Sequence, residues 1–515
     1  MNHPRSVLAI FCAVIFGGAL RADVTLAPLF TDHAVLQRDR VIPVWGHASP
    51  GENVTVSFHG QDVSTKTDRD GRWAVQLSPL PAASQGADLV VAGRNTIALH
   101  DILIGEVWIC SGQSNMEFLV HGTNLRLMNS DQEVAAAKHP LIRHFKVAHD
   151  VSGVPMDAAS GSWAVCSPAT VGQFTAVGYF FGREISRKLQ VPVGLINSSW
   201  GGTQIESWMS ADTLQSDPAF AVVGQRWRQA LADYPEKLAA YKLARPAWDK
   251  ARAAAAAAGP ARLAAFLVAN PRPNLPVGPG SPDTPSGLYN GMIQPLIPYS
   301  IRGAIWYQGE SNARRANEYH RLFAAMITSW REKFGQGDFP FFWVQLANYG
   351  RPDDPTQETW AYLREAQGQA LSLPATGQAV TIDVGDPKDI HPTNKQEVGR
   401  RLALIAKALV YGTPVDYSGP VFASATREGR ALRVRFRFAG TGLTAGDRPL
   451  QSFEIAGADR IFHPASAAIA GDTLRVQAPE VPEPVAVRYA WRNAPDANLY
   501  NGAGLPASPF RSDSW

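Results

Sequence analysis

The middle of the chain, residues 101–411, alternates apolar strand-like runs with helix-like segments, and this alternation constrains the fold more than any other feature. Apolar runs that predict buried strands lie at 102–110, 191–203, 301–312, 339–350 and 377–387. Segments that predict helices lie at 177–189, 318–334, 359–371 and 395–410. Because strands joined through helices run parallel, we expect an α/β domain with a mostly parallel sheet covered by helices on both faces, in three layers.

Polar clusters follow four of the predicted strands, each at the carboxyl end. The clusters are Ser114, then Gly201 with Gly202, then Gln308 with Glu310, and finally Asp386, Asp389 and His391. In open parallel sheets, functional residues gather beyond the carboxyl ends of the strands. Each cluster taken alone has an ordinary explanation, such as a helix cap or a tight turn. The four together predict one shared pocket.

Ser114 lies where the first predicted strand turns into a helix-compatible segment, within GEVWICSGQSNM. A serine at such a turn is exposed, and its own amide can bind the oxyanion that it creates. A serine hydroxyl needs a base, and His391 is the candidate. The histidine needs an acceptor in turn, for which we prefer Asp389 and keep Asp386 and Glu310 as alternatives. These residues predict acyl transfer to serine followed by hydrolysis.

Further oxyanion donors are available in the same clusters. A backbone amide of Gly201 or Gly202 can approach a reacting carbonyl closely, and the Gln308 side chain can supply another donor. The clusters lack paired His or Cys at zinc-ligand spacing, and the chain lacks Walker and dinucleotide glycine patterns, so we expect no metal and no cofactor. Met116 replaces the second glycine of a Gly-x-Ser-x-Gly elbow, which argues against the common lipase type.

The sequence on either side of the α/β domain has a different pattern. Residues 23–100 and 412–515 consist of short β-rich segments separated by Gly, Pro and Asp, which predicts a β-sandwich domain before the α/β domain and a β-rich domain after it. Residues 212–284 are rich in Ala, Lys and Arg and then dense in Pro and Gly. They predict a helical insertion within the α/β domain.

The N-terminus predicts export. Residues 1–22 combine a basic start, an apolar run and small residues, which is typical of a secretory signal peptide for the periplasm or the extracellular space, with no membrane contact after cleavage. A formal net charge of +3 without a basic run argues against nucleic acid as a partner. Cys110 and Cys166 can form a disulfide in an oxidising compartment, although the sequence does not place them close together. The oligomeric state stays open.

Four ordered blocks of sequence, and a fifth near the C-terminus, resemble the sialate O-acetylesterase family within the SGNH hydrolases. The blocks are GEVWICSGQSNMEF, NSSWGGTQIESW, LYNGMIQPL followed by IRGAIWYQGESN, DIHPTNKQEVGRRLAL, and VRYAWRNAPDANLYNGAGLPASPF. The similarity runs from about residue 25 to the end, interrupted by the insertion. It implies an SGNH-type domain in a secreted esterase that removes O-acetyl groups from sugars, with Ser114 as nucleophile and His391 as base.

The resemblance also implies further roles. It assigns a glycine of the 201–202 pair and Gln308 to the oxyanion, although the general SGNH pattern has Asn where this chain has Gln308. The usual Asp three residues before the histidine is replaced by Lys388, which leaves the acid partner open. The predicted substrate-binding residues lie in the same blocks and are Trp200, Trp208, Asn290, Glu310 and Asn312.

The substrate class remains open between two groups of acetylated sugars. The family name points to acetylated sialic acids, whereas similar proteins look like deacetylases of plant cell-wall glycans such as xylan or xyloglucan. A sialate carboxylate favours an arginine near the pocket, where Arg314 and Arg315 are candidates, and a neutral glycan favours aromatic platforms. The predicted function is a carbohydrate O-acetylesterase that forms an acetyl-enzyme. The alternative is a non-catalytic carbohydrate-binding protein built on an esterase scaffold.

Overall fold

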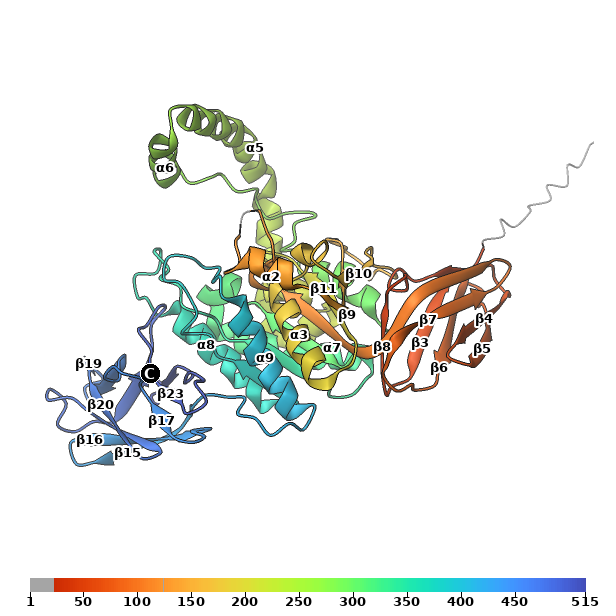
Figure 1. The fold of residues 1–515 in the computed structure, drawn as a ribbon. Helices are drawn as coiled ribbons and strands as arrows, with labels where there is room; N and C mark the ends of the chain where they lie inside the picture. The colour runs from red at the N-terminus through yellow and green to blue at the C-terminus, as the bar shows by residue number, and fades with distance from the viewer. Residues whose placement is uncertain (1–22, 124) are drawn as a thin grey trace, which may run out of the picture.

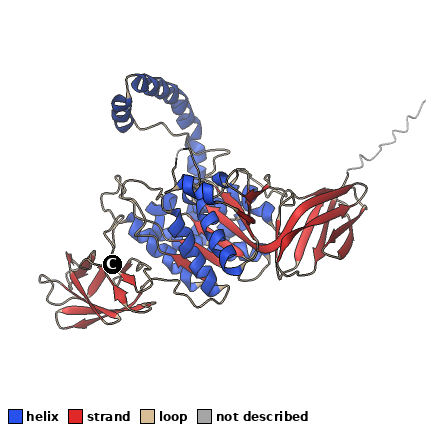
Figure 2. Cartoon of the chain, in the orientation of Figure 1, coloured by secondary structure: helices blue, strands red, loops and turns tan. Residues whose placement is uncertain are grey.

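The computed structural model describes residues 23–123 and 125–515. An N-terminal β domain, a central α/β domain and a C-terminal β domain follow one another along the molecule, and a helical arm projects from the central domain (Figure 1). Helices concentrate in the centre, whereas strands dominate both ends (Figure 2). The predicted signal peptide, residues 1–22, lies outside the described residues. None of the helices in the described ranges combines the length and the hydrophobicity that a membrane-spanning helix requires.

The central sheet has the strand order β10-β9-β11-β8-β12-β13-β14. The strands are β8 (Thr96–Gly112), β9 (His139–Lys146), β10 (Trp163–Cys166), β11 (Val193–Ser199), β12 (Gly303–Tyr307), β13 (Phe341–Val344) and β14 (Thr376–Ala379). Neighbouring strands are parallel except for the edge strand β10, which pairs antiparallel with β9. All residues of β11, β12 and β13 are buried, as expected for strands covered on both faces. The predicted α/β class is confirmed.

Helices cover both faces of this sheet. One face carries α3 (Ala176–Leu189) and α9 (Lys395–Leu409) with the short α2 (Ser130–Ala136) beside them, and the other carries α7 (Ala316–Phe334) and α8 (Thr359–Gln369). Trp108 of β8 packs against Phe181 of α3, whereas Trp306 of β12 packs against Phe323 of α7. Helices α3, α7, α8 and α9 begin and end within two residues of the predicted bounds, because the period of an amphipathic helix depends only on neighbouring residues.

Strand β8 belongs to two domains at once. Its N-terminal part pairs with β7 (Ala83–Ala92) and β2 (Val35–Gln37), and its C-terminal part pairs with β11 and β12. The other strands of the N-terminal domain are β1 (Thr25–Leu26), β3 (Ile42–His47), β4 (Asn53–Phe58), β5 (Gln61–Lys66) and β6 (Arg72–Leu77). The domain boundary expected after residue 100 therefore lies inside a continuous strand, and the strand that leads to Ser114 is anchored in both domains.

The insertion and the C-terminal domain flank the α/β core. The insertion contains α4 (Ala211–Ser216), α5 (Ala221–Ala257) and α6 (Pro260–Ala269), and α5 with α6 forms the projecting arm (Figure 1). The C-terminal strands are β15 (Val421–Glu428), β16 (Ala431–Arg437), β17 (Leu443–Thr444), β18 (Phe453–Ala456), β19 (Phe462–Pro464), β20 (Ser466–Ala470), β21 (Thr473–Gln477), β22 (Ala486–Tyr489), β23 (Tyr500–Asn501) and β24 (Phe510–Arg511). Val380 and Ile382, which follow β14, pack into the core of this C-terminal domain. The C-terminal domain thus packs at the carboxyl edge of the central sheet.

Candidate active site

The turn between β8 and α1 (Ser114–Glu117) presents Ser114 at the carboxyl end of the central strand. Gly112 has a φ of 132°, and a Cβ atom there would lie 2.2 Å from the Tyr307 carbonyl oxygen. Only glycine therefore lets the two neighbouring strands stay this close at the turn. Ser114 is the first residue of α1, so its amide has no acceptor within the helix and is free for an incoming oxygen.

Ser114 and His391 meet at this edge of the sheet. His391 Nε2 lies 2.9 Å from Ser114 Oγ. On the other side of the ring, His391 Nδ1 lies 3.6 Å from Asp389 Oδ1, which also accepts a 2.9 Å hydrogen bond from the His391 amide. Burial lowers the pKa of His391, and the nearby Lys395 lowers it further against the opposing effect of Asp389. The lowered pKa favours the neutral imidazole, which is the form that accepts a proton.

The alternative acids do not contact His391. Asp386 Oδ1 accepts a 2.8 Å hydrogen bond from the Lys388 amide, which shapes the loop before the histidine. Glu310 is buried, and its Oε1 lies 2.6 Å from Asn115 Nδ2. In the described part of the chain, Asp389 is therefore the carboxylate that faces the His391 ring.

A buried network behind the nucleophile was not predicted from the sequence. Asn115 Nδ2 donates to Glu310 Oε1 over 2.6 Å and to the Ile390 carbonyl over 3.0 Å, and Asn115 Oδ1 accepts a 2.5 Å hydrogen bond from Lys395 Nζ. Desolvation lowers the pKa of Lys395 to about 7 and raises the pKa of Glu310. Asn115 therefore links the nucleophile turn to the residue before His391. The sequence signal that could have indicated this network is Lys395, which lies four residues after His391 at the start of a helix.

The structure separates the two glycines of the predicted oxyanion site. The Gly201 amide donates a 2.7 Å hydrogen bond to Glu117 Oε2 and is therefore engaged. Gly202 has a φ of 79°, and its amide has no hydrogen-bond acceptor among the described residues. A Cβ atom on Gly201 would lie 3.2 Å from Ser114 Cβ, so this turn adjoins the nucleophile. Among the described residues, the amides of Ser114 and Gly202 have no hydrogen-bond acceptor, which makes them the candidate oxyanion donors.

Gln308 is not free to act as an oxyanion donor, which corrects the prediction. Its side chain is fully buried, and its Nε2 donates to Asn312 Oδ1 over 2.7 Å and to the Thr203 carbonyl over 3.2 Å. Its Oε1 accepts a 2.9 Å hydrogen bond from the Tyr319 hydroxyl. Both amide hydrogens are therefore used inside the protein. Tyr319 comes from α7, so the orientation of this side chain depends on tertiary packing.

Most of the predicted substrate-binding residues are buried, which corrects that prediction as well. Trp208 donates to Thr203 Oγ1, Asn312 donates to Glu206, Asn290 donates to the Ser152 carbonyl, and Glu310 accepts from Asn115. These side chains support the loops instead of facing a sugar. Trp200 is partly exposed, and its ring stacks on His149 with centroids 4.0 Å apart and planes 7° apart.

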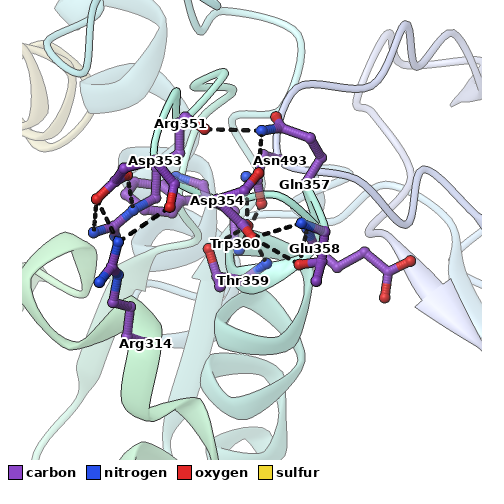
Figure 3. Close-up of polar contacts among 10 residues, drawn as sticks. Arg314, Arg351, Asp353, Asp354, Gln357, Glu358, Thr359, Trp360 and Asn493 are labelled. Atoms are coloured by element: carbon purple, nitrogen blue, oxygen red, sulfur yellow. Dashed lines mark hydrogen bonds and ion pairs between the residues drawn. The ribbon is translucent and has the colours of Figure 1, made fainter.

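The loop between β13 and α8 supports the His391 loop from behind. The Gly350 amide donates a 2.8 Å hydrogen bond to the Pro387 carbonyl, four residues before His391. Asp354, in the same loop, accepts hydrogen bonds from Thr359 at the start of α8 and from Asn493 of the C-terminal domain (Figure 3). The C-terminal domain therefore stabilises the loop that braces the catalytic histidine candidate, a role that no local sequence signal predicted.

Neither a disulfide nor a metal centre occurs in the described residues. Cys110 and Cys166 are separate buried thiols, so the disulfide considered from the sequence is not formed. Burial raises the pKa of both thiols, that of Cys166 to about 12. Within residues 23–123 and 125–515, no group of three or more His, Cys, Asp or Glu is arranged to hold a metal ion.

Comparison with known proteins gives one consistent family. The family described as "Carbohydrate esterase, sialic acid-specific acetylesterase" matches residues 104–241 and 283–407, which include Ser114 and His391. Sialate O-acetylesterase from Mus musculus is 31% identical over 464 residues, which cover 82% of this chain and 80% of that protein. The human sialate O-acetylesterase is 29% identical over 462 residues, covering 82% of this chain and 78% of that protein.

A solved structure gives the same result. The crystal structure of a carbohydrate acetylesterase from Xanthomonas citri is 40% identical, covers 96% of this chain and 100% of that one, and superposes with a TM-score of 0.79. The family predicted from the sequence blocks is confirmed, and the alternative of a non-catalytic binding protein is set aside. The chain therefore belongs to the sialic acid-specific acetylesterase family of carbohydrate esterases and is a carboxylic ester hydrolase.

Proposed function

We propose that this enzyme removes O-acetyl groups from sugars through an acetyl-enzyme on Ser114. The observation that carries the proposal is the 2.9 Å contact between Ser114 Oγ and His391 Nε2, two residues 277 positions apart in the chain. A serine hydroxyl beside a neutral imidazole is the arrangement that nucleophilic acyl transfer requires. Family membership supports an acetyl ester of a sugar as the substrate.

The proposed reaction uses two free amides and one base. His391 takes the Ser114 proton while Oγ bonds to the acetyl carbon, and the amides of Ser114 and Gly202 donate to the resulting oxyanion. Each such donor lowers the barrier by about 3–4 kcal/mol. The bond from the acetyl carbon to the sugar oxygen then breaks, and the sugar oxygen takes the proton from His391. Water, deprotonated by His391, attacks the acetyl-enzyme, acetate leaves, and Ser114 regains its proton.

Asp389 is the proposed orienting acid. Its carboxylate lies 3.6 Å from His391 Nδ1 and its side chain is 51% exposed, so it holds the ring less firmly than a buried hydrogen-bonded carboxylate would. We therefore expect Asp389→Ala to lower kcat less than His391→Ala does. Asp386→Ala is the matched control, because its carboxylate contacts the Lys388 amide and not the ring.

The arginines beside the site favour a neutral glycan over a sialate. Arg314 pairs with Asp353, and Arg315 pairs with Glu206 over 3.0 Å, so both guanidinium groups already have carboxylate partners. A sialate carboxylate would have to displace one of them. Trp200 offers a partly exposed aromatic ring next to the turn that adjoins Ser114, and a neutral sugar ring can pack against it. We therefore rank acetylated xylan or xyloglucan above O-acetylated sialic acid.

The proposed location is the periplasm or the extracellular space. The composition of residues 1–22 supports export. The formal net charge of +3 without a basic run argues against nucleic acid as a partner, and the proposed partner is the acetylated carbohydrate.

The test is acetate release from O-acetylated sialic acid and from acetylated xylan or xyloglucan, with Ser114→Ala as the blank. Ser111→Ala is a matched control, because that neighbouring hydroxyl is buried without a hydrogen-bond partner among the described residues. Activity retained in Ser114→Ala would refute the nucleophile. Release from the sialate alone would overturn the substrate ranking. No release from any of these substrates, or from a simple aryl acetate, would overturn the proposed function.

A further inference from the structure

Glu117 connects the nucleophile helix to the loop that carries the proposed oxyanion donor. This oxyanion loop comprises residues 199–203. Glu117 Oε2 accepts a 2.7 Å hydrogen bond from the Gly201 amide, and Glu117 Oε1 lies 3.0 Å from His149 Nε2. Glu117 ends the same four-residue helix that Ser114 begins. The Glu117 carboxylate therefore fixes the positions of the oxyanion loop and of His149 relative to Ser114.

His149 contacts the oxyanion loop at two further points. Its Nε2 lies 3.1 Å from the Ser199 carbonyl as well as 3.0 Å from Glu117, and since both neighbours are acceptors, Nε2 carries a hydrogen. Its ring stacks on Trp200 with centroids 4.0 Å apart. Burial raises the pKa of Glu117, but the hydrogen bonds from His149 and Gly201 outweigh it and hold that pKa below its usual value. The carboxylate is thus charged and both of its oxygens are occupied.

The remaining contacts of the oxyanion loop hold the peptide that carries the Gly202 amide. The Trp200 amide donates to the Gly112 carbonyl over 3.0 Å, and the Gly202 carbonyl accepts a 2.9 Å hydrogen bond from Ser311 Oγ. With the Gly201 amide on Glu117, the loop is fixed on both sides of the Gly202 amide, which has no acceptor among the described residues. An unpartnered donor on a loop that is hydrogen-bonded on both sides of it is the arrangement expected of a preorganised oxyanion site.

We infer that Glu117 is a positioning residue that holds the oxyanion loop so that the Gly202 amide stays directed at the reacting carbonyl. The inference rests on the proposed function. Without the carboxylate, the Gly201 amide and His149 lose their common acceptor, and the peptide that bears the Gly202 amide is released. A displaced donor weakens binding of the charged transition state far more than binding of the neutral ester, so kcat falls while KM does not.

The experiment measures kcat and KM for 4-nitrophenyl acetate with Glu117→Ala and Glu117→Gln. We expect kcat to fall about 10²-fold in the alanine variant, the lower end of the effect of deleting one oxyanion donor, with KM within about twofold. Glu117→Gln keeps one acceptor oxygen and should lose less. Glu365→Ala is the matched control, because this half-buried carboxylate pairs with Arg511 and, in the described part of the chain, makes no hydrogen bond or ion pair with Glu117 or the oxyanion loop, so kcat should be unchanged. The midpoint temperature of thermal unfolding should remain close to that of the wild-type protein in all variants.

The His149→Ala variant provides an independent test. It removes the second contact of Glu117 and should lower kcat less than Glu117→Ala does. Because both residues act on one loop, the double variant should be no slower than Glu117→Ala alone, whereas independent losses would multiply. Multiplied losses, a wild-type kcat in Glu117→Ala, or a loss confined to KM would overturn the inference. A wild-type enzyme inactive on acetate esters would instead overturn the proposed function, so the two failures are distinguishable.

Discussion

The junction between α8 and the C-terminal domain allows a quantitative prediction for Asp354→Ala. Asp354 is 4% exposed, and its carboxylate accepts hydrogen bonds of 2.7 to 3.1 Å from the amide and hydroxyl of Thr356 and Thr359 and from Asn493 Nδ2 (Figure 3). Asn493 is fully buried and also accepts a 2.9 Å hydrogen bond from the Trp360 amide. Asp354 thus caps α8 and ties it to the C-terminal domain.

The expected loss of stability in Asp354→Ala depends on which of the hydrogen-bond donors to Asp354 can bond to water instead. Thr356 is exposed, so its groups can bond to water in the variant. The buried Asn493 amide loses its acceptor, at a cost of about 2 kcal/mol. Loss of the cap on α8 costs about 1 kcal/mol more. We therefore expect the free energy of opening this junction to fall by about 3 kcal/mol, which corresponds to hydrogen exchange about 10²-fold faster.

The assay is hydrogen exchange followed by mass spectrometry on peptides that cover α8 and residues 491–495. Asp353→Ala is the matched control, because the Asp353 carboxylate is 59% exposed and its ion pairs with Arg314 and Arg351 should contribute little to stability. The double variant Asp354→Ala with Asn493→Ala should be less destabilised than the two single losses predict, by about 1–2 kcal/mol. Exchange that is unchanged in Asp354→Ala, or losses that simply add, would refute the reasoning.

The same carboxylate makes the junction sensitive to acid. Burial raises the pKa of Asp354, but its hydrogen bonds outweigh burial and hold the pKa well below the usual value. A carboxyl group with a depressed native pKa contributes its full stability above its unfolded pKa of about 3.9, and this contribution is lost as the pH falls towards the native pKa. After correction for the intrinsic exchange rate at each pH, protection at the junction should therefore fall progressively below about pH 4, and the wild-type and Asp354→Ala proteins should approach each other as the pH nears the native pKa.

Three further predictions concern the residues around the nucleophile. Lys395→Met should move the acid limb of the kcat/KM profile to higher pH, because loss of a nearby positive charge raises the pKa of His391, and an unmoved limb would contradict that electrostatic role. The native protein should react with a thiol reagent at neither Cys110 nor Cys166, which are buried with raised pKa values, and mass spectrometry before and after unfolding checks this. Gly112→Ala should abolish acetate release and reduce the yield of folded protein, because its Cβ would lie 2.2 Å from a carbonyl oxygen of the next strand; a soluble, active variant would show that the turn can relax.

The sequence alone determined the features that depend on short-range patterns. Helices α3, α7, α8 and α9 were predicted to within two residues, because the period of an amphipathic helix is contained in a dozen neighbouring residues. The meeting of Ser114 and His391 was predictable for a related reason, since parallel strands direct their carboxyl ends to one edge of the sheet. The fold class therefore follows from the alternation of apolar strands with helices, and the position of the site follows from the polar residues that come directly after those strands.

The tertiary structure was needed to show which polar groups are free to act. Gln308 ends a strand as predicted, yet Tyr319 and Asn312 use its side chain completely, and Gly201 differs from Gly202 because Glu117 binds only the first. These outcomes depend on partners that come from distant parts of the chain. Inside a protein nearly every polar atom must find a hydrogen-bond partner, so the group left for chemistry is known only after all the others are paired.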